Sequence, residues 1–177
     1  MTKKTIKTNW IYFPQSSEPP EFIRKVVAVF EGNEDLLVAK SKNMISNEVL
    51  AVLRTGLQEL GFQVETGKKA LEKIPVPVLY GRNGSVSKSF DADAWHREQK
   101  VVLEVEAGRG YANNQFLKDL FQCCMMHDVD YCAIAVRHRY IDTNDFENVA
   151  MFFQTLYTSG RIKLPLKGVL LIGYGPA

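Results

Sequence analysis

The chain has 177 residues, of which 46% are hydrophobic and 24% are charged, and its formal net charge at pH 7 is +2. This composition is ordinary for a soluble globular protein, and the length favours one domain over 1–177 with a full hydrophobic core. The small net charge gives no sign of a polyanion partner for the whole surface, although a local basic surface can still bind phosphates.

The sequence argues against a secreted or membrane-bound protein. The first residues, MTKKTIKTNW, carry lysines with no apolar run after them, so we expect no secretory signal. No uninterrupted apolar stretch approaches the roughly 20 residues that span a bilayer. Two of the three cysteines, Cys123 and Cys124, are adjacent on an expected helix and make a poor disulfide framework. We therefore expect a cytoplasmic protein with reduced thiols and no membrane contact.

Hydrophobic spacing and turn residues predict the elements of the first half of the chain. Leucines and valines at helical spacing predict a helix over 49–60, with Ser46 or Asn47 as its N-cap and Gly61 as its stop. Asn83 and Gly84 can supply the positive φ angles of a tight hairpin turn. In chain order we expect a docked aromatic segment within 1–20, a helix over 21–30, the helix over 49–60, a strand over 62–65, a polar and basic connection over 66–75, a strand over 75–81 and a turn at 82–84.

The second half of the chain alternates helices and strands after an acidic stretch at 90–110. The nearly continuous apolar run over 130–137 predicts a buried central strand. The other expected elements are a helix over 111–127, a helix over 145–158 and a strand over 167–175. This order predicts an α/β domain in which helices flank a central mixed β-sheet.

The acidic stretch from Phe90 to Gly110 is expected to form two strands joined by a short polar turn. Asp91 with Asp93, and Glu104 with Glu106, are spaced so that each pair lies on one face of its strand, about 6.5–7 Å apart. In an antiparallel hairpin the two pairs converge, and four carboxylates in one place call for a cation. Hard oxygen ligands of this kind suit Mg²⁺, or Mn²⁺ in its place, and not zinc.

A plainer interpretation is that these four acids decorate the solvated face of a hairpin. Alternation of apolar and acidic residues is also typical of any half-exposed strand. Against it, Asp and Glu are poor strand formers, and like charges opposed across strands destabilise a sheet. We therefore favour the metal site.

The acidic residues and the helix after them, in FDADAW…VVLEVEAGRG…FLKDLFQ, resemble the PD-(D/E)XK nuclease superfamily, which has the restriction-endonuclease-like fold. In that family a helix leads into a three-stranded meander, a second helix and a fourth strand (αβββαβ). The resemblance covers a core of about 46–139, which leaves 1–45 as an N-terminal extension and 140–177 as a C-terminal helix and strand. The catalytic Asp is best matched by Asp93, eleven residues before the triplet Glu104-Val105-Glu106.

The triplet departs from the family pattern at its last position, where Glu106 replaces the usual Lys. The chain is similar here to the BamHI and BglII branch of restriction enzymes, which carries Glu or Gln at this position. The resemblance implies metal-dependent hydrolysis of phosphodiester bonds in double-stranded DNA, by a homodimer where both strands are cut, with no organic cofactor.

Two-metal hydrolysis chemistry suggests roles for the acids. Asp93 and Glu104 would bridge the metal ions, and the backbone carbonyl of Val105 is a further ligand. Glu106 would orient or deprotonate the attacking water, since close anions raise a carboxyl pKa. Asp91 shares the face of Asp93 and stays an alternative ligand. Glu48 resembles the acidic residue that some family members add to the site.

Polar and basic residues near these acids are candidates for nucleic-acid contacts. Exposed amides at a helix start, with Arg and Asn side chains, bind phosphates and base edges well. Helix capping and solvated loops are equally good explanations for several of these residues. The candidates are Arg109, Asn113, Asn114, Lys118, Lys68, Lys69, Arg137 and Arg139.

Two other functional classes remain open. A domain of the same fold that has lost catalysis could serve as a DNA-binding or protein-interaction module, and the missing Lys supports this alternative. An α/β protein with purely structural acids would bind neither metal nor nucleic acid. The affinity for a divalent metal separates the hypotheses, because a degraded site loses it first.

Overall fold

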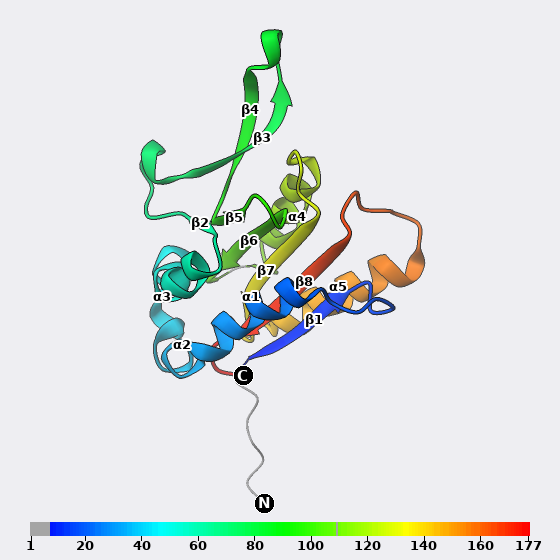
Figure 1. The fold of residues 1–177 in the computed structure, drawn as a ribbon. Coiled ribbons are helices and arrows are strands. Elements are labelled where there is room, and N and C mark those ends of the chain that lie inside the picture. The colour runs from blue at the N-terminus through cyan, green and yellow to red at the C-terminus, as the bar shows by residue number, and fades with distance from the viewer. Residues whose placement is uncertain (1–7, 109) are drawn as a thin grey trace, which may run out of the picture.

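A mixed sheet of six strands forms the centre of the computed structural model, which describes residues 8–108 and 110–177 (Figure 1). The strand order is β1-β8-β7-β6-β5-β2. The three middle strands β8, β7 and β6 are parallel to one another, whereas β1, β5 and β2 are antiparallel to their neighbours. The strands are β1 (Asn9–Phe13), β2 (Gln63–Val64), β5 (Ala94–His96), β6 (Val101–Glu106), β7 (Tyr131–Arg137) and β8 (Gly168–Tyr174).

Helices cover both faces of this sheet and make a three-layer α/β/α arrangement. The helices α1, α2 and α3 pack on one face and share a core with Leu103 and Val105. The helices α4 and α5 pack on the other face, against Val102 and Ile134. Their bounds are α1 (Glu21–Gly32), α2 (Glu34–Lys40), α3 (Ser46–Glu59), α4 (Gln115–Met125) and α5 (Asp145–Ser159), with short 3₁₀ turns η1 (Ser41–Asn43), η2 (Ala70–Glu72) and η3 (Arg82–Gly84).

A separate two-stranded antiparallel ribbon stands away from the sheet (Figure 1). It consists of β3 (Ile74–Tyr80) and β4 (Val86–Ala92), joined by η3. Only its base is buried, where Val76 and Ala92 pack beside α4 and α5. The ribbon interrupts the run of antiparallel strands between β2 and β5.

The fold confirms the expected α/β class and the central mixed sheet flanked by helices. The aromatic segment near the N-terminus docks as the edge strand β1, and the apolar run over 130–137 is the central strand β7, buried at six of its seven positions. The positive φ angles expected at Asn83 and Gly84 are 57° and 73°. Of the helices in the described residues, none is long and apolar enough to cross a membrane.

Two expected helix starts were wrong. The expected helix over 111–127 begins only at Gln115, because Asn114 adopts a left-handed conformation with φ 53° and ends a preceding turn. The N-cap of α3 is Ile45, not Ser46 or Asn47, and its amide donates to Glu48 Oε2 at 2.9 Å. The hydroxyl of Ser46 is used elsewhere, since it accepts a hydrogen bond from the Ala107 amide at 3.2 Å.

Candidate active site

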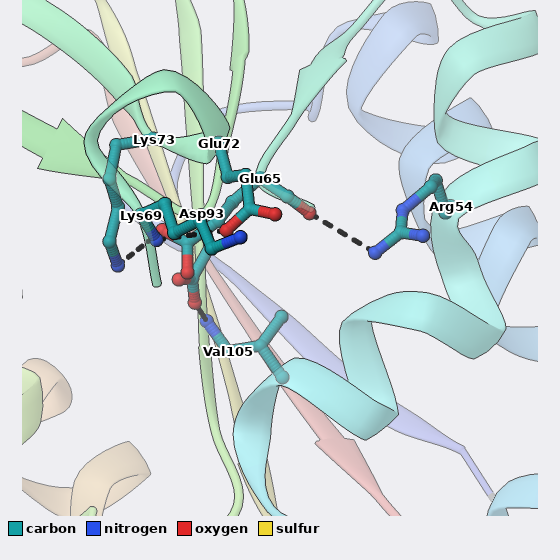
Figure 2. Close-up of polar contacts among 7 residues, drawn as sticks. All are labelled: Arg54, Glu65, Lys69, Glu72, Lys73, Asp93 and Val105. Carbon is teal, nitrogen blue, oxygen red and sulfur yellow. Dashed lines mark hydrogen bonds and ion pairs between the residues drawn. The ribbon is translucent and has the colours of Figure 1, made fainter. Parts of the chain in front are cut away.

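Asp93 lies at a bend between two strands, and its carboxylate takes the place of a backbone acceptor. The chain leaves the ribbon at Ala92 and enters the main sheet at Ala94. At this bend Asp93 Oδ2 accepts a hydrogen bond from the Val105 amide at 2.7 Å (Figure 2). Its backbone carbonyl accepts from the Glu65 amide at 2.8 Å. The Asp93 side chain is therefore held against β6 by the same corner that sends the ribbon outward.

Glu104 and Glu106 lie near the C-terminal end of β6, on the face that α4 covers. Alternation along the strand puts both on the side of Val102, which packs in the core beneath α4 and α5. Glu104 is buried, with 7% of its surface exposed, and Glu106 is half-buried. The antiparallel register of β5 and β6, Ala94 opposite Leu103, extends to bring Glu104 opposite Asp93. The expected convergence of the acids across a hairpin is thus observed for these three residues.

A fourth carboxylate comes from α4 and was missed from the sequence. Asp119 is only 4% exposed, although it is an acid on a helix face shared with Phe116 and Cys123. The helical spacing i, i+3, i+7 of these three residues is the signal that could have found it, because it puts Asp119 on the buried face of α4. The residue thus faces the sheet and not solvent.

One polar cavity of about 440 Å³ collects these carboxylates. Acids exceed cations on its wall, so its electrostatic character is negative. The ribbon contributes the Lys88–Asp91 segment, and Ser46 closes the side next to α3. The remaining lining residues are Glu65, Lys73, Asp93, Glu104, Val105, Glu106, Lys118, Asp119 and Gln122.

Burial and mutual repulsion raise the carboxyl pKa values in this cavity. Burial, together with the charges of Glu65 and Asp119, raises the pKa of Asp93 to about 7, although its hydrogen bond to Val105 opposes the rise. Burial first and the charge of Asp93 second hold the pKa of Glu104 well above its usual range. These acids therefore retain protons at pH values where exposed carboxyls have lost them.

Glu106 and Asp119 form a second acid pair at the outer side of the cavity. Burial, the charge of Asp119 and a hydrogen bond with Asp119 raise the pKa of Glu106 to about 8. Burial also raises the pKa of Asp119, while the hydrogen bond from Glu106 and the nearby Lys118 lower it. Glu106 is thus the protonated donor of this pair, and Asp119 is the acceptor.

The chemistry of these donors fits a hard divalent cation. Among the described residues, Glu104 Oε1 and Asp119 Oδ2 are buried oxygens that have no hydrogen-bond partner. Carboxylate oxygens are the ligands that Mg²⁺ and Mn²⁺ prefer. In the same described part of the chain, no three His, Cys, Asp or Glu side chains are already arranged to hold a metal ion. The carboxylates would therefore have to turn toward a bound cation.

Lys73 is a cation on the wall of the cavity. It reaches from the connection before β3 to Glu65, where its ammonium lies 2.9 Å from Oε2 (Figure 2). The carbonyl of Glu65 accepts a weaker hydrogen bond from Arg54 of α3, at 3.3 Å. The hydrogen bond with Glu65 and the charges of Asp91 and Asp93 raise the pKa of Lys73, although burial lowers it. This ammonium therefore stays charged beside the acid cluster.

The two secondary ligand candidates have different positions. Asp91 lines the cavity, but it lies on the ribbon opposite Pro75 and is exposed. Glu48 does not line the cavity; its carboxylate is used to cap α3 through the Ile45 amide. The structure thus brings Asp91 to the acid cluster and leaves Glu48 outside it.

The candidate nucleic-acid residues are scattered over three regions. Lys118 lines the carboxylate cavity, and Asn113 and Asn114 are exposed just before α4. Lys68 and Lys69 are exposed on the connection before η2. Arg109 lies outside the described residues.

Arg137, a candidate for nucleic-acid contact, connects two segments of the fold. It is buried, and its guanidinium donates to the carbonyls of Lys42 and Met44 at 3.2 and 2.5 Å. It ties the end of β7 to the segment that leads into α3. Arg139 beside it is exposed and, with Arg137, lines a different cavity of about 500 Å³.

Comparisons with known proteins give no family for the chain, since no protein-family model matches it and no curated protein is significantly similar to it.

Proposed function

We propose that the chain is a metal-dependent DNA endonuclease that hydrolyses phosphodiester bonds at the carboxylate cavity. The observation that carries this proposal is the convergence of Asp93, Glu104, Glu106 and Asp119 on one cavity, two of them with buried unpartnered oxygens. Burying repelling carboxylates destabilises a fold. Such a cluster is expected where a cation and a reaction require it.

The order of elements supports a restriction-endonuclease-like core. A helix (α3) precedes the antiparallel strands β2, β5 and β6, and then α4 leads to β7, which is parallel to β6. This agrees with the αβββαβ order of the PD-(D/E)XK superfamily, with the ribbon inserted after the first strand. Asp93, at the bend that leads into β5, lies beside the Glu104-Val105-Glu106 triplet on the neighbouring strand β6, which supports the resemblance.

In this proposal Asp93, Glu104 and the Val105 carbonyl hold Mg²⁺, or Mn²⁺ in its place. Asp91 at the cavity wall is the further candidate ligand. A bound divalent ion would neutralise phosphoryl charge, lower the pKa of a water molecule and stabilise the leaving alkoxide. The hydrogen bond from the Val105 amide keeps the Asp93 carboxylate oriented toward the cavity.

Glu106 is the proposed general base in place of the usual Lys. Its carboxyl group must first lose its own proton, and with a pKa of about 8 the resulting carboxylate is basic enough to accept a proton from water. Asp119 is its hydrogen-bond partner and fixes the orientation of the Glu106 carboxyl group. Lys73 and Lys118 line the same cavity and supply positive charge for a phosphate oxygen.

Double-stranded DNA is the proposed substrate, and a homodimer would bring a second cavity to the opposite strand. The test is calorimetric titration of Mn²⁺ into the wild type and into Glu104→Gln, with nicking of supercoiled plasmid measured in parallel. Glu31→Gln on the exposed side of α1 is the matched control. We expect binding and nicking in the wild type and the control, and loss of both in Glu104→Gln.

The second candidate function is a nuclease-like module that binds DNA or a protein without cutting. Two observations favour it: Glu106 stands where the family has Lys, and the acids are not already arranged around a metal position. Wild-type protein that binds no Mn²⁺ at millimolar concentration and neutral pH would reject the endonuclease in favour of this module.

A further inference from the structure

We infer that the β3–β4 ribbon is a DNA-reading arm that enters the major groove of the duplex whose backbone lies at the carboxylate cavity. This inference rests on the proposed function, because the cavity sets where the duplex lies. It adds a recognition element that the acidic residues do not provide.

The ribbon is too exposed to be explained by its own packing. All residues from Gly81 to Lys88 are exposed, and the apolar side chains of Leu79, Tyr80 and Val86 are 59%, 49% and 52% exposed. A two-stranded ribbon by itself is only marginally stable in water. An arm of this kind is therefore expected to gain order and stability from a partner.

The charge of the ribbon selects a polyanion as that partner. From Lys73 to Phe90 the sequence has three cations, Lys73, Arg82 and Lys88, and no acid. Lys73 is paired with Glu65 at the base, while Arg82 lies at the exposed tip and Lys88 along the outer half of β4. The chain as a whole has a net charge of only +2. A stretch of 18 residues whose charged side chains are all basic is therefore a local feature of the surface.

The dimensions of the ribbon suit the major groove of DNA. Strands of seven residues extend about 23 Å at roughly 3.3 Å per residue. The major groove of B-form DNA, about 12 Å wide, admits a two-stranded ribbon, whereas that of double-stranded RNA is too narrow. The tip presents Arg82 and Asn83, residue types that bind phosphates as well as guanine and adenine edges.

The ribbon and the cavity share a wall, so one duplex can contact both. The Lys88–Asp91 segment of β4 lines the cavity, and the same strand continues outward to the tip. A duplex with its scissile phosphate at the carboxylate cavity would therefore pass alongside the ribbon.

The free edge of β3 is poorly suited to pair with a strand from a second copy of the chain. Pro75 and Pro77 remove two amide donors from β3, and prolines on an edge discourage the addition of another strand. The carbonyl of Pro77 is already occupied by the His127 amide at 2.7 Å. Tyr80 packs edge-on against the His127 ring, with 5.2 Å between centroids.

The test measures DNA affinity by fluorescence anisotropy in EDTA, where no cleavage can occur, across a range of salt concentrations. The variant is Arg82→Ala with Lys88→Ala, and the single Arg82→Ala separates the tip from the cavity wall. The matched control is Arg161→Ala with Lys163→Ala, an exposed Arg and Lys pair between α5 and β8. Thermal unfolding checks that every variant is folded.

Each lost phosphate contact reduces the salt slope by about 0.9, so the double variant should lower it by about 2 and weaken binding on the order of 50-fold at 0.1 M salt. The single variant should lower the slope by about 1, the control should bind like the wild type, and a DNA duplex should bind more tightly than the same sequence as RNA. Unchanged affinity and slope in the double variant, or a wild type that binds no duplex, would overturn the inference. The inference would also be overturned if the ribbon substitutions dissociated a dimer of the protein without weakening its binding to DNA.

Plasmid nicking in Mn²⁺ separates this inference from the proposed function. Ribbon-dependent binding without nicking by the wild type would support the arm and reject the endonuclease. Nicking with DNA affinity that is insensitive to the ribbon substitutions would support the endonuclease and reject the arm.

Discussion

Asp93 combines two properties that usually exclude each other, because its carboxylate is an acceptor for the sheet and a member of a repelling acid cluster. The Val105 amide donates to it at 2.7 Å, and burial with nearby charges raises its pKa to about 7. Removing the charge and removing the acceptor should therefore have opposite effects on stability. We expect Asp93→Asn to unfold at a higher urea concentration than the wild type at pH 8. The substitution removes the repelling charge, while its amide oxygen still accepts the hydrogen bond from the Val105 amide.

Asp93→Ala should instead lose about 1–3 kcal/mol relative to Asp93→Asn, because it leaves the Val105 amide without its acceptor. Urea unfolding followed by circular dichroism measures both differences. Equal stability of the two variants would mean that the hydrogen bond to Val105 contributes nothing to the corner.

Asp119 is a buried acid whose Oδ2 has no hydrogen-bond partner among the described residues, so it opposes the packing of α4. We expect Asp119→Asn to raise the free energy of unfolding at pH 8 by on the order of 1 kcal/mol, because a neutral amide is cheaper to bury than a carboxylate. The same change should weaken Mn²⁺ binding. Chemical unfolding at pH 8 measures the first effect, with the exposed Asp142→Asn as the control; a destabilised Asp119→Asn would contradict the prediction.

Sequence reasoning reached the strand acids but not their partners, for a physical reason. The spacing of Glu104 and Glu106 along one strand fixes their common face without knowledge of the fold. Asp119 and Glu65 join the cluster only through tertiary packing of α4 and through the pairing of β2 with β5. The sequence around Lys73 has no pattern that predicts its ion pair with Glu65.

At the scale of elements, the sequence predicted most strands but not how they pair. The expected strand over 75–81 and the turn at 82–84 are found as β3 and η3, and the two strands expected in the acidic stretch are found as β5 and β6. The expected position of the first acid pair was wrong, because Asp91 belongs to the β3–β4 ribbon and Asp93 lies at the bend between β4 and β5. Strand pairing is decided by tertiary contacts. Here it depends on the bend at Asp93, which the spacing of hydrophobic residues in the sequence does not predict.

The connection between β7 and α3 depends on one guanidinium. Arg137 donates to two carbonyls of the segment before α3, and Lys cannot reproduce this fork. We expect Arg137→Lys to lose about 2–3 kcal/mol of unfolding free energy, with an unchanged salt slope for DNA binding. The control is Arg139→Lys, which is exposed and should change stability by no more than about 0.5 kcal/mol. An Arg137→Lys variant as stable as the wild type would contradict the prediction.

At the scale of the whole molecule, the two sides of the sheet contribute differently to the stability of the fold. Its parallel centre is buried between two helical layers and supplies the stability. The acids gather where β6 meets the antiparallel strand β5, and the ribbon leaves from the same side; both cost stability in the absence of a partner. The fold thus concentrates its unfavourable charges at the side where the ribbon leaves the body.

This arrangement predicts how the stability of the whole molecule depends on pH without metal. Asp93 and Glu106 have pKa values of about 7 and 8 in the folded state, against roughly 4 for unfolded carboxyls. Between about pH 4 and pH 8 the folded state therefore binds more protons than the unfolded state. Its free energy of unfolding must fall as the pH rises through this range. Each extra proton held contributes a slope of about 1.4 kcal/mol per pH unit.

Divalent metal should reverse this fall, because a bound cation competes with protons for the same oxygens and stabilises only the folded state. We expect Mn²⁺ to raise the unfolding temperature more at pH 8 than at pH 6, and to leave Glu104→Gln unaffected at both. In EDTA the wild type should lose stability across this range more steeply than Glu104→Gln, which has one repelling carboxylate fewer. Thermal unfolding at four pH values, with and without Mn²⁺, makes the comparison, and a wild-type stability that is flat with pH in EDTA would show that the acids are not buried together in solution.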